Sequence, residues 1–213
     1  MRRTVVCISS QDGAGAAEAA TLVASTLGFR LIDEDIVMRA AVEAGVHHDV
    51  FVDLEQRKSL LIRLVEGMGS AGTATGYAVP GAFVATGLPA SEDLRAMIRA
   101  VIEDTAVEGS AVIVAHAASH ALADREDVLR VLLTAPRETR ERRIAAALGV
   151  SDKDAAKTLK RSDAAREDYL KRFYGINVEQ PTHYDLVVNT DKLAPEDAAE
   201  LIVQAAAGRS AAI

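Results

Sequence analysis

The chain has 213 residues, of which 49% are hydrophobic and 26% charged, the profile of one globular domain with a substantial core. Its net charge of −7 argues against a general nucleic-acid-binding surface, so an anionic ligand would need a local basic pocket. One cysteine, Cys7, allows no intramolecular disulfide, and no apolar run approaches the roughly 18 residues of a membrane span, so we expect a cytoplasmic protein without a membrane contact.

The first part of the chain alternates between strand and helix patterns. Residues 4–8 are apolar and β-branched, which predicts a buried strand. Residues 16–27 carry apolar side chains at helical spacing, and Gly28 ends this helix. Residues 29–32 predict a second strand, and residues 34–44 and 53–66 predict two further helices.

Residues 67–89 differ in composition from the rest of the chain. They read GMGSAGTATGYAVPGAFVATGLP, with six glycines and two prolines, which interrupt any long regular element. A loop of this length in a compact domain usually has a function or forms an interface. Its apolar residues argue against plain disorder, so we expect a lid-like or partner-contact segment, for example a homodimer contact.

The second half of the chain continues the alternation. Strands are expected at residues 111–115, 128–133 and 185–189, and helices at residues 91–108, 137–148, 151–173 and 195–207. This pattern predicts a single α/β domain over residues 1–213, a parallel sheet with helices on both faces. Ligands of such sheets bind at the carboxyl ends of the strands.

A glycine-containing loop follows the first predicted strand, in the stretch VCISSQDGAGAAEAA. Glycines let the backbone turn so that its N–H groups converge on phosphate oxygens, and the following helix N-terminus adds partial positive charge. The pattern G-x-x-x-x-G-K-[ST] has no match here, so a tight structural turn is the competing interpretation. The expected phosphate-binding residues are Gly13, Ala14, Gly15, Ala16 and Ala17.

From the first strand to the last helix, the chain resembles the cytidylate-kinase-like group of P-loop kinases. Members read roughly S-R-E-x-G-S-G-G-R-E-I-A after the first strand, where this chain reads SSQDGAGAAEAA. LIDEDIV is similar to their Y-Y-D-x-E-I-I, and VIVAHAA to their V-I-V-G-R-G-A. The most specific matches are RVLLTAPRETRERRI, a K-x-x-D-x-x-R helix, and RFYGINVEQPTHYDLVVNT. Only residues 67–89 lie outside the resemblance.

The resemblance implies a three-layer α/β/α P-loop kinase-like fold with five parallel strands in the order 2-3-1-4-5. It implies transfer of the γ-phosphoryl group of ATP to a nucleoside monophosphate such as CMP, with Mg²⁺ accompanying the ATP. It also implies that Asp163 contacts the sugar of the acceptor and that Arg166 lies near its phosphate. Lys160 shares their helix face by spacing, and a surface ion-pair row is the competing interpretation of all three residues.

Two further residues are candidates for acceptor binding. Asp33 directly follows the second predicted strand, where a carboxylate could hold a substrate or cap the next helix. His116 follows the third strand, at a position where the family has an arginine that contacts the acceptor phosphate. An imidazole there could donate a hydrogen bond to an anion or only pack. One cysteine and five scattered histidines predict no metal cluster.

The chain also departs from the family pattern at the phosphate loop, because Ala17 replaces the basic residue. Losing one aimed cation costs roughly 10²–10³ in rate, so catalysis would need cations from elsewhere. The helix at residues 137–148 carries four arginines, of which Arg140 and Arg143 are the candidate catalytic cations. The competing interpretation is a solvated basic face paired with Glu138 and Glu141.

Three functions therefore remain open from the sequence. The chain is an active kinase of nucleoside monophosphates, or a catalytically silent relative that acts as a nucleotide-binding or interaction module. Ala17 and His116 favour the silent form. A P-loop transferase for another phosphorylated or sulfated donor is the third reading, which Ala17 and Glu18 permit.

Overall fold

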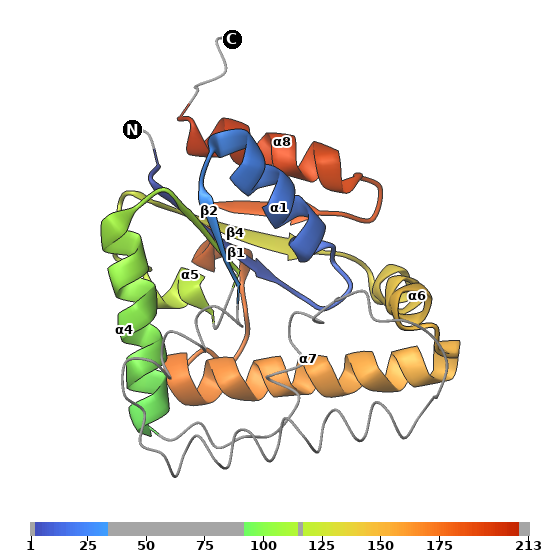
Figure 1. Cartoon of the computed structure of the whole chain (residues 1–213). Helices are drawn as coiled ribbons and strands as arrows, with labels where there is room; N and C mark the ends of the chain where they lie inside the picture. The colour runs from blue at the N-terminus through green and yellow to red at the C-terminus, as the bar shows by residue number, and fades with distance from the viewer. Residues whose placement is uncertain (1–2, 34–91, 115–116, 209–213) are drawn as a thin grey trace.

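One parallel sheet of five strands forms the centre of the fold in a computed structural model that describes residues 3–33, 92–114 and 117–208 (Figure 1). The strand order is β2-β3-β1-β4-β5, the order implied by the resemblance. The strands are β1 (Val5–Ser10), β2 (Arg30–Asp33), β3 (Ala111–Val114), β4 (Val128–Thr134) and β5 (Leu186–Asn189). All four strand pairings are parallel, as expected for strands that alternate with helices.

Helices cover both faces of this sheet, which makes the fold a three-layer α/β/α arrangement (Figure 1). The helices α1 and α8 lie side by side on one face, and α4, α5 and α7 lie on the other. Helix α6 packs against α7 beyond the end of β4. Their bounds are α1 (Ala16–Leu27), α4 (Glu92–Glu108), α5 (Ala118–Ala121), α6 (Arg137–Leu148), α7 (Asp152–Tyr174) and α8 (Pro195–Ala206).

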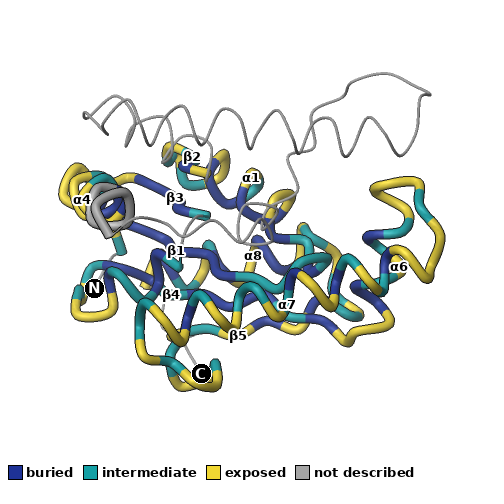
Figure 2. Tube along the Cα trace, turned by 90° about the horizontal axis from the view of Figure 1, so that it is seen from below, coloured by how far each residue is buried: buried dark blue, intermediate teal, exposed yellow. Residues whose placement is uncertain are grey.

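The apolar core is divided by the sheet into two clusters, because successive strand residues point to opposite faces. In β1, Val6 and Ile8 pack with α1 and α8, whereas Val5 and Cys7 pack toward α4 and α5. Figure 2 shows buried residues along the central strands of the sheet. Burial raises the pKa of the Cys7 thiol to about 12, so Cys7 is a core residue.

Most helix predictions agree closely with the structure. Helices α1 and α6 have the predicted bounds, and α7 begins after Ser151, whose side chain accepts a hydrogen bond from the Asp154 amide. The strands differ from prediction by one or two residues, since β1 continues to Ser10 and β2 begins at Arg30. The four-residue helix α5 was not predicted, because it is too short to show periodicity.

Several predictions lie outside the described residues: the helices at 34–44 and 53–66, the segment 67–89, and position 116. We therefore keep as predictions the single domain over the whole chain and the homodimer contact. The cytoplasmic location also stays a prediction. Within the described ranges, none of the helices is both long and apolar enough to cross a membrane.

Candidate functional site

The loop between β1 and α1 has the backbone geometry of an anion-binding turn. Gly13 and Gly15 have φ values of 79° and 82°, which favour glycine. Gly15 is the N-cap of α1, and no side chain caps the amides of the first helical turn. Those amides, together with the helix dipole, are the donors that phosphate oxygens use at such a turn.

The two alanines after Gly15 remove the side chains of a Walker loop. That motif places Lys and then Ser or Thr directly after its last glycine. Here Gly15 is followed by Ala16, and Ala17 occupies the basic position of the family pattern. Ala16 is buried at 5% exposure, whereas Ala17 is exposed. The loop therefore offers backbone donors but neither the lysine nor the hydroxyl.

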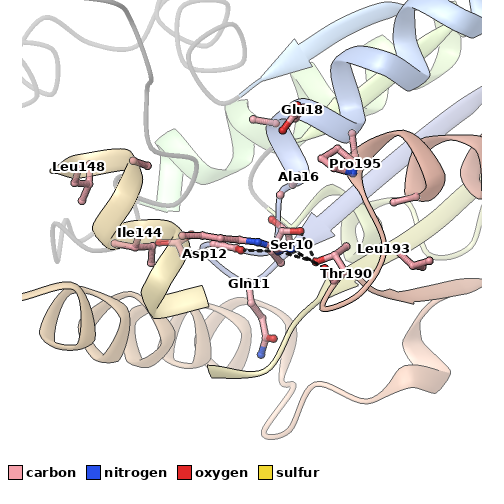
Figure 3. Close-up of a pocket in the computed structure, with 18 of the residues that line it drawn as sticks. Ser10, Gln11, Asp12, Ala16, Glu18, Ile144, Leu148, Thr190, Leu193 and Pro195 are labelled. Atoms are coloured by element: carbon pink, nitrogen blue, oxygen red, sulfur yellow. Dashed lines mark hydrogen bonds between the residues drawn. The ribbon is translucent and has the colours of Figure 1, made fainter. Parts of the chain in front are cut away.

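A cavity of about 410 Å³ lies over this loop (Figure 3). Ser10 and Asp12 border it from the loop. Ile144 and Leu148 of α6 form one wall, and Leu193 and Pro195, at the start of α8, form the opposite wall. Aliphatic walls next to a turn of free amides suit a ligand with a flat apolar part and an anionic part.

Arg143 is the arginine of α6 that borders this cavity. Its Nη1 donates to the Gly13 carbonyl oxygen at 3.2 Å and to Thr190 Oγ1 at 3.0 Å, and its Nη2 donates to the Thr190 carbonyl at 2.6 Å. The Thr190 hydroxyl donates in turn to the Ala14 carbonyl at 3.0 Å. Arg143 and Thr190 therefore tie α6 and the end of β5 to the phosphate-binding loop.

Arg140 does not border the cavity. Its side chain is only 6% exposed, and its guanidinium makes a bidentate pair with Asp163 of α7, at 2.8 and 2.9 Å. Nη1 also lies 3.4 Å from the Asp12 carbonyl oxygen, to which it donates. Its Nε is buried without a partner in the described part of the chain. In this structure Arg140 is a buried, paired cation, so acting as a lid cation would require it to leave Asp163.

Asp12 links the same loop to α7. Its carboxylate accepts a hydrogen bond from the hydroxyl of Ser162, which is 6% exposed. Burial and the nearby Asp163 carboxylate raise the pKa of Asp12, outweighing the Ser162 hydroxyl and the Arg140 and Arg166 charges that lower it.

Arg166 belongs to a second polar cluster. It donates to Glu179 from Nε at 3.0 Å and from Nη2 at 2.6 Å, and the Tyr184 hydroxyl also donates to Glu179. His120 Nε2 lies 3.2 Å from the Tyr184 oxygen. Burial by itself would raise the pKa of Glu179, but hydrogen bonds from His120, Arg166 and Tyr184 lower it well below its ordinary value.

The structure separates the residues predicted for acceptor binding. Asp163 and Arg166 do not form an ion-pair row, because each pairs with a different element, Arg140 of α6 and Glu179 beyond α7. Lys160 is exposed, and Asp33 is an exposed residue at the end of β2. The competing interpretation of α6 as a solvated basic face is only partly correct: Arg137 is exposed and pairs with Glu141, whereas Arg140 is buried.

Sequence reasoning missed several residues of these two networks. Two of them, Thr190 and Ser162, carry no charge, and no pattern in the sequence marks Glu179. Only the fold brings these residues to the loop or to Arg166. The stretch RFYGINVEQPTHYDLVVNT contains Glu179, Tyr184 and Thr190 and was the most specific part of the resemblance. That match was the sequence signal that could have pointed to these residues.

The part of the chain that the structure describes does not fit a protein-held Mg²⁺. It contains no group of three His, Cys, Asp or Glu side chains placed to hold a metal ion. At the position of the Walker hydroxyl, which binds Mg²⁺, this chain has no Ser or Thr.

The chain is similar to known proteins in its sequence and in its fold. A family model described as "Cytidylate kinase-like family" matches residues 5–192. A cytidylate kinase of Ignicoccus hospitalis is 30% identical over 199 residues, which cover 93% of this chain and 96% of that protein. A cytidylate kinase of Aeropyrum pernix is 39% identical over 107 residues, which cover 50% of this chain and 61% of that protein.

Among solved structures, an uncharacterized protein from Eubacterium ventriosum has a similar fold. The TM-score is 0.68 at 15% sequence identity, and the match covers 98% of this chain and 100% of that one. This likeness concerns the fold alone. The family model, by contrast, matches the sequence from β1 to the residues after β5, so the chain belongs to the cytidylate kinase-like family.

Proposed function

We propose that the cavity over the β1–α1 loop binds the donor nucleotide, with its phosphates on the loop amides. The observation that carries this proposal is the combination of an uncapped helix N-terminus at Gly15 with an aliphatic cavity of about 410 Å³ beside it. The amides would hold the phosphates, and the walls around Ile144 and Leu193 would hold the base.

If the protein is active, it transfers the γ-phosphoryl group of ATP to a nucleoside monophosphate such as CMP. A phosphate oxygen of the acceptor bonds to the γ-phosphorus while the bond from that phosphorus to the β–γ bridging oxygen breaks, which releases ADP. Phosphoryl transfer depends mainly on positioning and on charge stabilisation. Gly13 and Gly15 cradle the phosphates, and Arg143 at the cavity wall is the best-placed arginine of α6 to supply charge.

The acceptor side of this proposal uses Asp163 and Arg166, with Asp33, His116 and Lys160 as further contacts. In the structure both Asp163 and Arg166 are paired with other side chains, so acceptor binding would exchange those pairs for contacts with the ligand. Mg²⁺ would arrive with the ATP and neutralise phosphate charge; Arg143 and the loop amides would do the orienting.

A silent nucleotide-binding protein is the second candidate, and two observations favour it. The loop has no lysine and no Ser or Thr directly after Gly15, and Ala17 replaces the basic residue of the family pattern. In addition, Arg140 is paired with Asp163, and Arg143 donates to Gly13 and Thr190. Binding through amides and apolar walls needs neither cation free, whereas transfer does.

Calorimetric titration with Mg-ATP, ADP and CMP, followed by an assay of phosphoryl transfer, separates the two candidates. Binding with turnover that Arg143→Ala abolishes supports the kinase. Binding without turnover supports the silent form. If no nucleotide binds, both are wrong, and titration with other phosphorylated or sulfated donors tests the remaining reading.

A further inference from the structure

Helix α7 is connected to the phosphate-binding loop by two neighbouring residues. Ser162 donates to the Asp12 carboxylate, and Asp163 holds the Arg140 guanidinium, which donates to the Asp12 carbonyl oxygen. The acceptor face of α7 and the donor loop therefore share one buried polar network.

The same network fixes α6 against the loop. A Cβ atom on Gly13 would lie 2.8 Å from the Arg140 carbonyl oxygen and 2.9 Å from its Cα, so the two backbones are in close contact. A buried guanidinium is strongly destabilised without its carboxylate. The position of Arg140, and with it the backbone beside Gly13, therefore depends on Asp163.

We propose that Ser162 and Asp163 are positioning residues for the donor site, which set the conformation of the phosphate-binding loop through Asp12 and Arg140. This proposal rests on the proposed nucleotide site and adds that two residues of α7 determine the conformation of the loop. Ser162 and Asp163 act on the loop without touching the donor. The loop has no lysine to hold phosphate, so its amide geometry determines how well the phosphates bind.

A helix that only supports the fold would behave differently. Ser151 provides the matched control, because it caps the same helix by accepting from the Asp154 amide and makes no contact with the loop in the described structure. Ser151→Ala weakens α7 at its start, whereas Ser162→Ala removes the hydroxyl that reaches Asp12. Asp163→Asn is a second variant, which keeps the size of the side chain and removes its charge.

The experiment compares the affinities of ADP and adenosine by calorimetry in the wild type and the three variants. Since adenosine has no phosphate, loop positioning predicts that Ser162→Ala and Asp163→Asn lower ADP affinity about tenfold while adenosine affinity changes less than about twofold. Ser151→Ala should leave the ratio of the two affinities unchanged. An equal loss for both ligands, or no loss for ADP, overturns the proposal.

A second measurement does not need a nucleotide. Hydrogen exchange of the amides of residues 11–17 should become about tenfold faster in Ser162→Ala than in Ser151→Ala. Unchanged exchange overturns the positioning role even if nucleotides bind. Faster exchange in a protein that binds no nucleotide supports the positioning role and disproves the proposed function, so the two failures are distinguishable.

Discussion

The α-carbon of Gly13 lies against the backbone of Arg140, which leaves no room for a side chain at position 13. A Cβ there would be 2.8 Å from the Arg140 carbonyl oxygen. Gly15 has a similar φ, but no atom within 4 Å of its Cβ position. The two glycines therefore serve different purposes: Gly13 permits a close contact, and Gly15 permits a turn.

This difference predicts unequal costs for two alanine substitutions. Gly15→Ala should lower the free energy of unfolding by about 1–2 kcal/mol, the cost of a positive φ. Gly13→Ala adds the clash with α6 and should lower it by about 3 kcal/mol or more. Urea denaturation of both variants measures the difference, and equal costs would contradict the close contact.

Glu179 should govern the acid stability of the protein. Its folded pKa lies below the ordinary value of 4.5, so its contribution is present above pH 4.5 and is lost as the pH falls toward the lower folded value. Glu179→Gln leaves the partly buried Arg166 without its carboxylate and should cost about 3 kcal/mol at pH 7. The cost should shrink as the pH falls below 4.5.

The matched control is Glu103→Gln, which breaks the exposed pair between Glu103 and Arg99 in α4. An exposed pair at this spacing is worth less than about 0.5 kcal/mol. Thermal or urea denaturation of both variants across pH 3–7 tests the prediction. A Glu179→Gln cost as small as that of Glu103→Gln would show that the Arg166 pair contributes little to stability.

We expect Asp12 to give the stability of the protein a pH dependence opposite in sign to that given by Glu179. Its folded pKa is raised, so the stability that its protonated form contributes is fully present below the ordinary value of 3.8 and is lost as the pH rises through the folded pKa. Asp12→Asn should therefore unfold at a higher temperature than the wild type at neutral pH, with no difference below pH 3.8. The Ser162 hydroxyl can still donate to the new amide oxygen.

Asp127 is the comparison for this change. Hydrogen bonds from Arg125 and Thr4 lower its pKa, so Asp127→Asn should be less stable than the wild type at neutral pH. At pH 7.5 the melting temperatures of the two variants should move in opposite directions from the wild type, and at pH 3.5 that of Asp12→Asn should match the wild type. A decrease for both would mean that the Asp12 carboxylate stabilises the loop.

The sequence was sufficient for the order of elements but not for the partners of the charged residues. Apolar spacing and Gly28 placed α1 correctly, and the bounds expected for α6 were also correct, because the signals of both helices are local. The resemblance supplied the strand order, which spacing could not. Spacing also put Asp163 and Arg166 on one face of α7, but their partners, Arg140 and Glu179, come from other elements.

The burial of Arg140 could not be predicted from the sequence. Four arginines within one helix are equivalent in the sequence, and burial depends on what packs over the helix. Only α7, folded across α6, makes Arg140 a buried cation and leaves Arg137 exposed. The loop could be identified from its glycines, whereas its supports, Ser162 and Thr190, are common residues without a pattern.

Restoring a cation to the loop should restore phosphate affinity. Ala17 is exposed and borders the cavity, so an arginine there can reach the phosphates without entering the core, unlike one at the buried Ala16. Ala17→Arg should raise ADP affinity about 10–100-fold, while adenosine affinity changes little. Ala17→Gln is the neutral control, and calorimetry with both ligands measures the effect.

The same variant also separates the two proposed functions. If only the loop cation has been lost, Ala17→Arg should produce or increase transfer from Mg-ATP to CMP. If the protein is a silent binder, ADP affinity should rise without transfer, because Arg140 and Arg143 stay engaged by Asp163 and Thr190. An equal gain from Ala17→Gln, or no gain in ADP affinity, would show that the phosphates do not lie on this loop.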